Sequence, residues 1–363
     1  EPFTLQFDDL NADQQTYYYT ITHCNADWSA SELLKSQYIK GIDEQPIQPE
    51  SNSYVTLQPY SHYRLTLPND LTKITLTGNY MLSISDSYGT EIFSRRFVVY
   101  NPLLGVQSEV KRSRNVQLSE NKQVIQFSIK QQNMLLQDPQ STLKIAVLQN
   151  YHWGTAITDL KPQYTMGNEL IYRYDVESSF DAGNEYFNFD SKDLRATSTG
   201  ILNIEQSQLY EIQLFTNTIR SNRVYTYNPD INGDFLVNTL NGQTASNEAD
   251  YVWVHFSLEA DPSFWNKEVF VYGKFSNYEL SDTYRLYYDQ ETGLFHGKIL
   301  LKQGFYNYKF VTKEKNEINF NEIDGNFHQT ENNYLILVYY RPIGTLYDQV
   351  IGVGSTNSTT ISR

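Results

Sequence analysis

Apolar and polar residues alternate with a period of two along most of the chain, which is the pattern of β-strands. The alternation is clearest in Gly304–Val311, where the even positions carry three aromatic residues that would share one face of a sheet. Asp289–Gly293 separates two such runs and predicts a hairpin loop. Only Ala30–Ile39 favours a helical turn. The pattern therefore predicts an all-β protein.

The predicted strands fall into three groups, separated by Asn-Pro pairs and polar stretches that break the alternation. The first group comprises Tyr17–Thr22, Tyr54–Leu57, Tyr63–Leu67, Asn79–Ser85 and Ile92–Val99. The second comprises Val124–Ile129, Leu143–Gln149, Leu170–Tyr174, Tyr186–Phe189 and Leu209–Thr216. The third comprises Val252–Leu258, Glu268–Gly273, Tyr284–Asp289, Leu294–Leu300, Gly304–Val311 and Tyr334–Tyr339. Three groups of this size predict three consecutive β-sandwich domains of the immunoglobulin-like or early-set type.

The same breaks set the expected domain boundaries. They predict an N-terminal β-sandwich over residues 1–102, a middle β-sandwich over 103–229, a C-terminal early-set β-sandwich over 230–346 and a flexible tail over 347–363. The tail is expected to fray because it is rich in Gly, Ser and Thr. Tyr151–Gly167 is expected to form a long loop of the middle domain.

The composition favours sheets and excludes several classes of function. Thirty tyrosines and 19 phenylalanines stand against three methionines, and Tyr and Phe favour half-buried sheet surfaces. The net charge of −14 comes without any block of Lys and Arg, so no nucleic-acid partner is expected. The single Cys24 excludes an internal disulfide, and no apolar run is long enough to predict a membrane-spanning helix.

No motif for catalysis, a metal or a cofactor stands out. The six histidines form no HxH or HxxxH pair, and neither a G-x-S-x-G elbow nor a Walker-type phosphate loop occurs. Asp230, Asn232 and Asp234 alternate as the ligands of a calcium loop do. Phe235, however, replaces the glycine of the sixth position, and Asn241 replaces the carboxylate of the twelfth. We expect a polar interdomain turn at these residues. For the protein as a whole we expect no catalytic residues, no metal and no cofactor.

One stretch of the third group resembles a family of carbohydrate-binding sandwiches. Gly273–Tyr278 (GKFSNY) and Tyr308–Phe310 (YKF) are similar in order and spacing to motifs of the family 48 carbohydrate-binding modules. The resemblance implies an early-set fold, with Tyr278 in place of the first tryptophan of the sugar-stacking platform. Residues 313–317, where the second tryptophan would follow, contain no aromatic residue. A carbohydrate-binding or surface-glycan module is therefore the alternative function.

Blocks along nearly the whole chain resemble another family, the plug proteins of the Bacteroidetes type IX secretion system. The blocks are Leu5–Leu10 (LQFDDL), Tyr17–Thr22 with His23–Trp28 (HCNADW), Gly78–Tyr80 (GNY), Tyr225–Asp230 with Asn232–Phe235, Gly325–Phe327 and Tyr339–Pro342 (YYRP). They occur in the family's order. The resemblance implies a periplasmic, non-enzymatic protein whose signal peptide was removed before Glu1.

The family's role implies a specific partner. A plug protein binds the periplasmic opening of the outer-membrane translocon β-barrel and seals it when no substrate is being exported. The resemblance thus implies contact with the membrane only through the barrel, and a monomer within the complex. A hydrolase with paired carboxylates near Tyr151–Gly167 is a third hypothesis, for which a cleft would be needed.

Aromatic residues are the candidates for contact with such a partner, because tyrosine and tryptophan bury a large area and keep a polar tip. The interaction candidates are Tyr278, Trp265, Trp28, Tyr340 and Arg341. Trp28 and Trp265 have a second interpretation, in which each is a core residue of its own sandwich. Cys24, on or beside a strand, is expected to be a buried and unreactive thiol.

Overall fold

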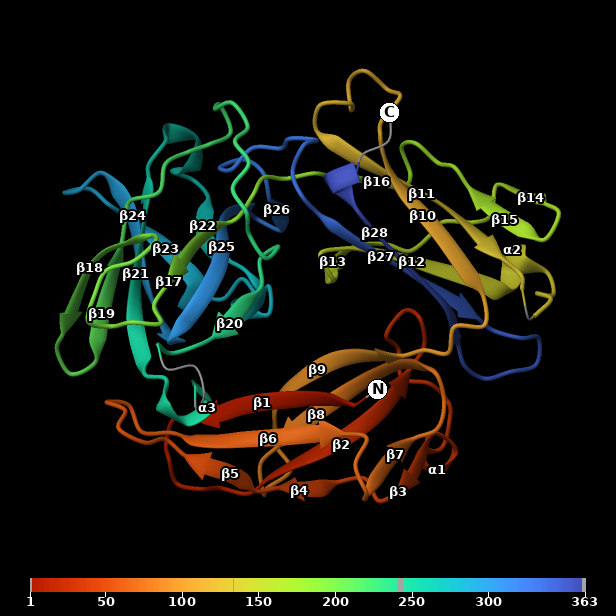
Figure 1. Ribbon diagram of the computed structural model, residues 1–363, viewed down its shortest axis with the longest axis horizontal. Coiled ribbons are helices and arrows are strands. Elements are labelled where there is room, and N and C mark those ends of the chain that lie inside the picture. Colours follow the sequence, from red (N-terminus) through yellow and green to blue (C-terminus); the bar gives the residue numbers. More distant parts are fainter. Residues whose placement is uncertain (1, 133, 241–244, 361–363) are drawn as a thin grey trace.

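The computed structural model describes residues 2–132, 134–240 and 245–360, and these are arranged in β-sheets with a few short helices (Figure 1). The sheets form three sandwich domains, so the all-β class predicted from the alternation is confirmed. Within the described residues, no helix has the length and apolar character needed to cross a membrane.

Domain 1 is built from the N-terminal strands and lies at the bottom of Figure 1, in red and orange. Its strands are β1 (Phe3–Asp9), β2 (Tyr17–Cys24), β3 (Ile39–Gly41), β4 (Gln45–Ile47), β5 (Pro49–Asn52), β6 (Ser61–Leu67), β7 (Thr72–Ile74), β8 (Gly78–Ser85) and β9 (Glu91–Val99), with the short helix α1 (Lys35–Tyr38). The sheets β1-β6-β5 and β4-β2-β8-β9 enclose the core, and β3 pairs with β7. Alternate residues of β6 and β8, such as Tyr63 and Tyr80, are fully buried there.

Domain 2 combines strands from two distant parts of the chain. Its first sheet contains β10 (Gly105–Arg112), β11 (Lys122–Lys130), β15 (Glu169–Tyr172), β14 (Tyr164–Met166) and β16 (Ser179–Asp181). Its second sheet has the order β13 (His152–Ile157), β12 (Leu143–Gln149), β27 (Asn333–Tyr340) and β28 (Gln349–Asn357), and α2 (Pro139–Thr142) precedes β12. The blue strands β27 and β28 therefore lie beside the yellow-green β12 in Figure 1.

Domain 3 is a single ten-stranded sheet that wraps around its own core. Its strands are β17 (Phe187–Asp190), β18 (Ile201–Gln206), β19 (Tyr210–Leu214), β20 (Phe235–Val237), β21 (Tyr251–Glu259), β22 (Glu268–Tyr272), β23 (Arg285–Asp289), β24 (Leu294–Lys302), β25 (Gly304–Glu314) and β26 (Glu317–Asn319), and α3 (Ala245–Glu248) precedes β21. Tyr306, Tyr308 and Phe310 of β25 all enter this core, as their alternate spacing predicts. Asp289–Gly293 forms the expected hairpin turn, closed by the hydrogen bond from Gly293 N to Asp289 O.

The sandwiches are not consecutive, because domain 3 is inserted between the two parts of domain 2. The sequence predicts Tyr186–Phe189 and Leu209–Thr216 in the middle domain, but the corresponding strands β17 and β19 belong to domain 3. It predicts Tyr334–Tyr339 in the C-terminal domain, but the corresponding strand β27 belongs to domain 2. The predicted domain boundaries at residues 229 and 346 therefore do not coincide with the limits of the sheets that form domains 2 and 3. Pairing of β27 with β12 over seven residues, from Leu143–Tyr340 to Gln149–Tyr334, decides this assignment.

The expected flexible tail is a strand over most of its described length. β28 pairs with β27, and Val350 and Ile351 are almost fully buried. The glycines that suggested fraying permit close packing instead: a Cβ placed on Gly354 would lie 2.5 Å from Val106 Cγ1. A small residue at this position lets β28 lie directly against β10.

Two further local expectations are corrected by hydrogen bonding. Tyr54–Leu57 forms no strand, because Tyr54 N donates to Asn247 O and Leu57 N donates to the Asp250 carboxylate of domain 3. Tyr151–Gly167 is not a free loop, since it contains β13 and β14, which extend the two sheets of domain 2.

Candidate functional site

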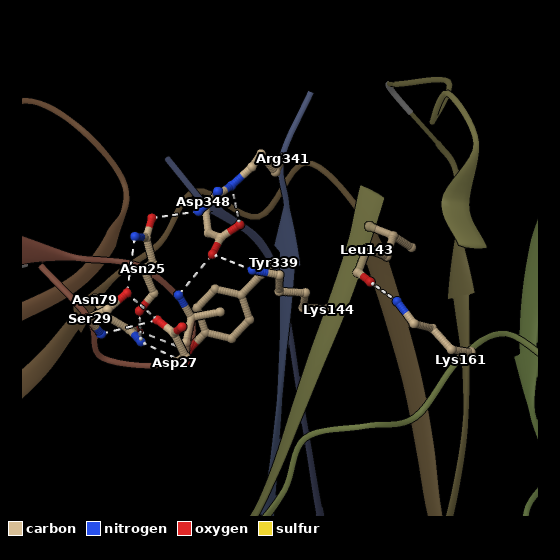
Figure 2. A network of polar contacts seen from close by, with 11 residues as sticks. Asn25, Asp27, Ser29, Asn79, Leu143, Lys144, Lys161, Tyr339, Arg341 and Asp348 are labelled. Carbon is tan, nitrogen blue, oxygen red and sulfur yellow. Dashed lines mark hydrogen bonds and ion pairs between the residues drawn. The ribbon is translucent and has the colours of Figure 1, made fainter. Parts of the chain in front are cut away.

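The sequence blocks at opposite ends of the chain meet between domains 1 and 2 (Figure 2). The HCNADW block begins with the last two residues of β2, and the YYRP block begins with the last two residues of β27. Asp348, in the loop before β28, joins them: its carboxylate accepts hydrogen bonds from Ala26 N at 2.9 Å, Arg341 Nε at 2.8 Å and Lys144 Nζ at 3.0 Å. We refer to Asn25, Ala26, Asn79, Tyr339, Arg341 and Asp348 as the Asp348 joint.

The electrostatics of the Asp348 joint favour a permanent contact. The Asp348 side chain is only 1% exposed. Burial alone would raise its pKa, but the hydrogen bonds from Ala26, Lys144 and Arg341 outweigh burial and hold the pKa below its ordinary value. The carboxylate is therefore ionised at neutral pH. Its two cations, Lys144 and Arg341, belong to domain 2, and its contact with domain 1 is the hydrogen bond from Ala26 N.

Side-chain amides complete the Asp348 joint. Arg341 Nη2 donates to Asn25 Oδ1 at 2.6 Å, and the Tyr339 hydroxyl donates to Asn79 Oδ1 at 2.8 Å. Asn79 Nδ2 in turn donates to Asn25 O at 3.1 Å. Gly78 is required beside these groups, since at its φ of +149° a Cβ would lie 2.3 Å from the buried His23 ring. The HCNADW, GNY and YYRP blocks thus fasten one domain to another.

An apolar contact lies next to the Asp348 joint. The rings of Trp28 and Trp153 meet edge to face with centroids 4.8 Å apart, and the Arg96 guanidinium lies 4.7 Å from the Trp28 ring. Ala26 and Val98 pack on the outer face of the β12–β27–β28 sheet. Trp28 is therefore an anchor between domains of the same chain.

A second buried charge cluster joins domain 1 to domain 3. Asp8 Oδ2 accepts from Lys302 Nζ at 2.6 Å and from the Tyr251 hydroxyl at 2.8 Å, while Asp8 Oδ1 lies 2.6 Å from His62 Nδ1. Lys302 Nζ also lies 4.1 Å from the centroid of the Tyr60 ring. Burial would raise the pKa of Asp8, but the bonds from His62 and Lys302 lower it below its ordinary value.

Domains 2 and 3 meet around a cavity of about 240 Å³. His152 of β13 contributes one wall, and its Nε2 lies 2.9 Å from the Tyr272 hydroxyl of β22. The Tyr278 ring packs on the same histidine, with centroids 4.3 Å apart. Tyr278 therefore contacts domain 2 and lines the cavity wall, whereas the stacking platform of a carbohydrate-binding module is open to solvent on the protein surface.

The five interaction candidates have different environments. Trp28 and Arg341 lie together between domains 1 and 2, Tyr278 is half-buried in the cavity wall, and Tyr340 is 3% exposed in the core of domain 2. Trp265 alone among them is largely exposed, at 61%. Its ring lies beside that of Tyr288, which is 41% exposed, with centroids 6.4 Å apart.

Several charged residues at these contacts are buried by a partner domain, which no local pattern of the sequence predicts. Asp348 and Lys302 lie outside the motifs quoted above, whereas Asp8 lies in LQFDDL and Lys309 in YKF, and neither motif indicates that its charge is buried. Cys24 is buried as expected, and burial raises the pKa of its thiol.

The possible calcium loop is a turn held by its own backbone. Asp230 accepts hydrogen bonds from Tyr186 N and Asn232 N, and Asp234 pairs with Lys274 at 2.6 Å. Burial raises the pKa of Asp230 to about 6. In the described part of the chain, no three His, Cys, Asp or Glu side chains are grouped as metal ligands.

The fold and its interdomain contacts define a protein of three β-sandwiches, held together by the hydrogen bonds of the Asp348 joint and by the buried Asp8–Lys302 ion pair. Residues 1–101 match the model of the type 9 secretion system plug protein 1st domain. A crystal structure of a hypothetical protein from Parabacteroides merdae is similar over 98% of this chain and 91% of that chain, with 32% identity and a TM-score of 0.93. The chain belongs to the same family as that protein, and its first domain is similar to the plug protein 1st domain. No curated protein matches the chain.

Proposed function

We propose that this protein is a non-enzymatic plug of the type IX secretion system. It binds the periplasmic opening of the outer-membrane translocon β-barrel and seals that opening when no substrate is being exported. The observation that carries the proposal is the match of residues 1–101 to the plug protein 1st domain. The proposal includes a periplasmic location, contact with the membrane only through the barrel, and a monomer in the complex.

A seal must resist deformation, and the contacts between the domains supply that property. Domain 1 is fastened to domain 2 through the Asp348 joint and to domain 3 through the Asp8–Lys302 pair at 2.6 Å. Domains 2 and 3 are linked twice by the chain itself, since domain 3 is an insertion. Each domain is thus held at more than one place, which favours a rigid body.

The exposed aromatic pair of Trp265 and Tyr288 is the surface that we assign to contact with the barrel. Tryptophan and tyrosine at the centre of an interface dominate its binding energy, because they desolvate a large rigid area. Trp265 is 61% exposed and Tyr288 is 41% exposed, so both side chains are accessible to a partner.

Binding to the purified barrel tests the proposal. The chain should co-purify with the empty barrel, and adding it should reduce the flux of a small dye through barrels reconstituted in vesicles. Trp265→Ala should weaken binding by about 2 kcal/mol, the loss expected for an interface anchor. Tyr88→Ala is the matched control, because Tyr88 is a 92% exposed aromatic residue of domain 1.

Failure of the wild-type chain to bind the barrel, both with and without an export substrate, would refute the plug function. Equal losses in the Trp265→Ala and Tyr88→Ala proteins would instead refute only the assigned surface.

A further inference from the structure

The cavity between domains 2 and 3 has walls from both domains and a mixed lining. Domain 2 contributes the β13 segment and the residues around β16, and domain 3 contributes β22, β25 and Phe320. Aromatic rings and side-chain amides share the lining with three charged side chains: Lys122, Asp181 and Lys309. At about 240 Å³, the cavity is smaller than the roughly 300–1,000 Å³ of pockets for drug-sized ligands.

Lys309 is the unusual residue of this cavity. The residue is only 8% exposed, and its ammonium group makes no hydrogen bond or ion pair with any part of the chain that the structure describes. Its Nζ lies 5.8 Å from the centroid of the Tyr186 ring. The ammonium reaches the cavity, but burial of the residue still lowers its pKa to about 8, and this desolvation costs stability and calls for a reason.

The neighbouring acids do not neutralise Lys309, because each has another cation. Asp324 forms an ion pair with Arg220 at 2.9 Å, and Asp181 forms one with Lys122 at 2.9 Å. Both carboxylates act on the Lys309 ammonium by electrostatic attraction at longer range. With Asp181 and Lys122 paired, the cavity lining keeps one uncompensated positive charge in a protein whose net charge is −14.

The other groups near Lys309 are neutral and suit an aromatic ligand. Burial lowers the pKa of His152 to about 4, with a smaller effect of Lys309, so the imidazole is neutral at pH 7. Tyr272 and Tyr278 lie with ring centroids 5.3 Å apart and line the same cavity. Aromatic faces next to a single ammonium are complementary to a planar acid.

We propose that this cavity binds a small aromatic carboxylate, whose anionic group accepts a hydrogen bond from Lys309 and whose ring packs against Tyr272 and Tyr278. The ligand would touch both domains at once. Its occupancy would therefore stabilise the arrangement of domains 2 and 3, as binding to the native state alone always does. The site is independent of the plug function.

Titration of the full chain with small acids tests this assignment. Benzoate, 4-hydroxybenzoate and phenylacetate are followed by ligand-observed NMR and calorimetry at pH 7, with benzamide as the neutral match for benzoate. At least one acid should bind saturably and raise the unfolding temperature, while benzamide should bind at least about tenfold more weakly, the loss of one charge-assisted hydrogen bond.

Two variants separate the site from the fold. Lys309→Met keeps an unbranched side chain in the cavity and should reduce affinity for the acid by about tenfold or more. Lys298→Met removes an exposed lysine of the same domain that does not line the cavity, and should bind as the wild type does. The proposal is overturned if none of the three acids binds, if benzamide binds as well as benzoate, or if Lys309→Met retains wild-type affinity.

Discussion

Buried charges decide much of the behaviour of this protein at the scale of single residues. The side chains of Asp8, Asp348 and Lys302 are buried with partners that satisfy them, whereas the ammonium of the buried Lys309 has no hydrogen-bond or ion-pair partner among the residues that the structure describes. Substitution therefore has opposite effects on the stability of the protein in the two cases. Removing the partner of a paired buried charge destabilises the protein, whereas removing an unpaired buried charge stabilises it.

Lys309→Met should therefore stabilise the protein. Burial lowers the pKa of Lys309 from 10.5 to about 8, and a shift of this size costs roughly 3 kcal/mol at neutral pH. We expect Lys309→Met to raise the free energy of unfolding by about 1–3 kcal/mol at pH 7, measured by thermal and urea unfolding.

Lys302→Met should have the opposite effect. It should lower the free energy of unfolding by about 3–5 kcal/mol in the same measurements, because it leaves the Asp8 carboxylate without the Lys302 ammonium.

The gain from Lys309→Met should shrink at higher pH. Between pH 8 and 10.5 the folded wild type has released the Lys309 proton while the unfolded chain still binds it, so wild-type stability from this group rises with pH. The difference between the variant and the wild type should thus fall from pH 7 to pH 10. A difference that stays constant over this range would contradict the assigned pKa.

At the scale of elements, strands with large alternating residues are visible in the sequence and strands with small residues are not. β25 alternates Tyr306, Tyr308 and Phe310 toward the core, and it was predicted correctly. β28 was taken for a tail because it contains Gly352, Gly354 and Ser355. Its small residues follow from its contact with β10, which no local pattern can indicate.

Ile351→Asp should show that β28 is part of the core of domain 2. Ile351 is 1% exposed, and a carboxylate there would be buried without a partner. We expect a loss of more than about 4 kcal/mol or failure to fold, measured by circular dichroism and urea unfolding. Ser355→Asp, at an exposed position of the same strand, should change stability by less than about 0.5 kcal/mol. Similar behaviour of the two variants would mean that β28 is not a core strand.

At the scale of the whole molecule, the order of the domains in space differs from their order in sequence. Domain 2 needs strands on both sides of domain 3, because β12 pairs with β27. The two connections between domains 2 and 3, the Asp348 joint and the Asp8–Lys302 pair hold the three sandwiches together. The HCNADW, GNY and YYRP blocks, which lie far apart in the chain, meet in the Asp348 joint.

The insertion makes a prediction about fragments. Residues 183–332 contain all strands of domain 3 and should fold alone, whereas residues 103–181 lack β27 and β28 and should not. Adding residues 333–357 to 103–181 through a short linker should restore folding, with chemical-shift dispersion in NMR spectra as the measurement. A folded 103–181 fragment would contradict the assignment of β27 and β28 to domain 2.

The sequence by itself determined the all-β class, the number of sandwiches and the likeness of the first domain to plug proteins, because period-two alternation and short motifs are local properties of the chain. Only the tertiary structure decided which strands share a sheet, where Trp28 and Arg341 lie, and that Lys309 is buried with no ion pair to any described residue. Burial and pairing depend on residues hundreds of positions away: Asp348 is 322 positions from Ala26, and Lys302 is 294 positions from Asp8. Their energies arise from desolvation by a neighbouring domain, which no window of sequence contains.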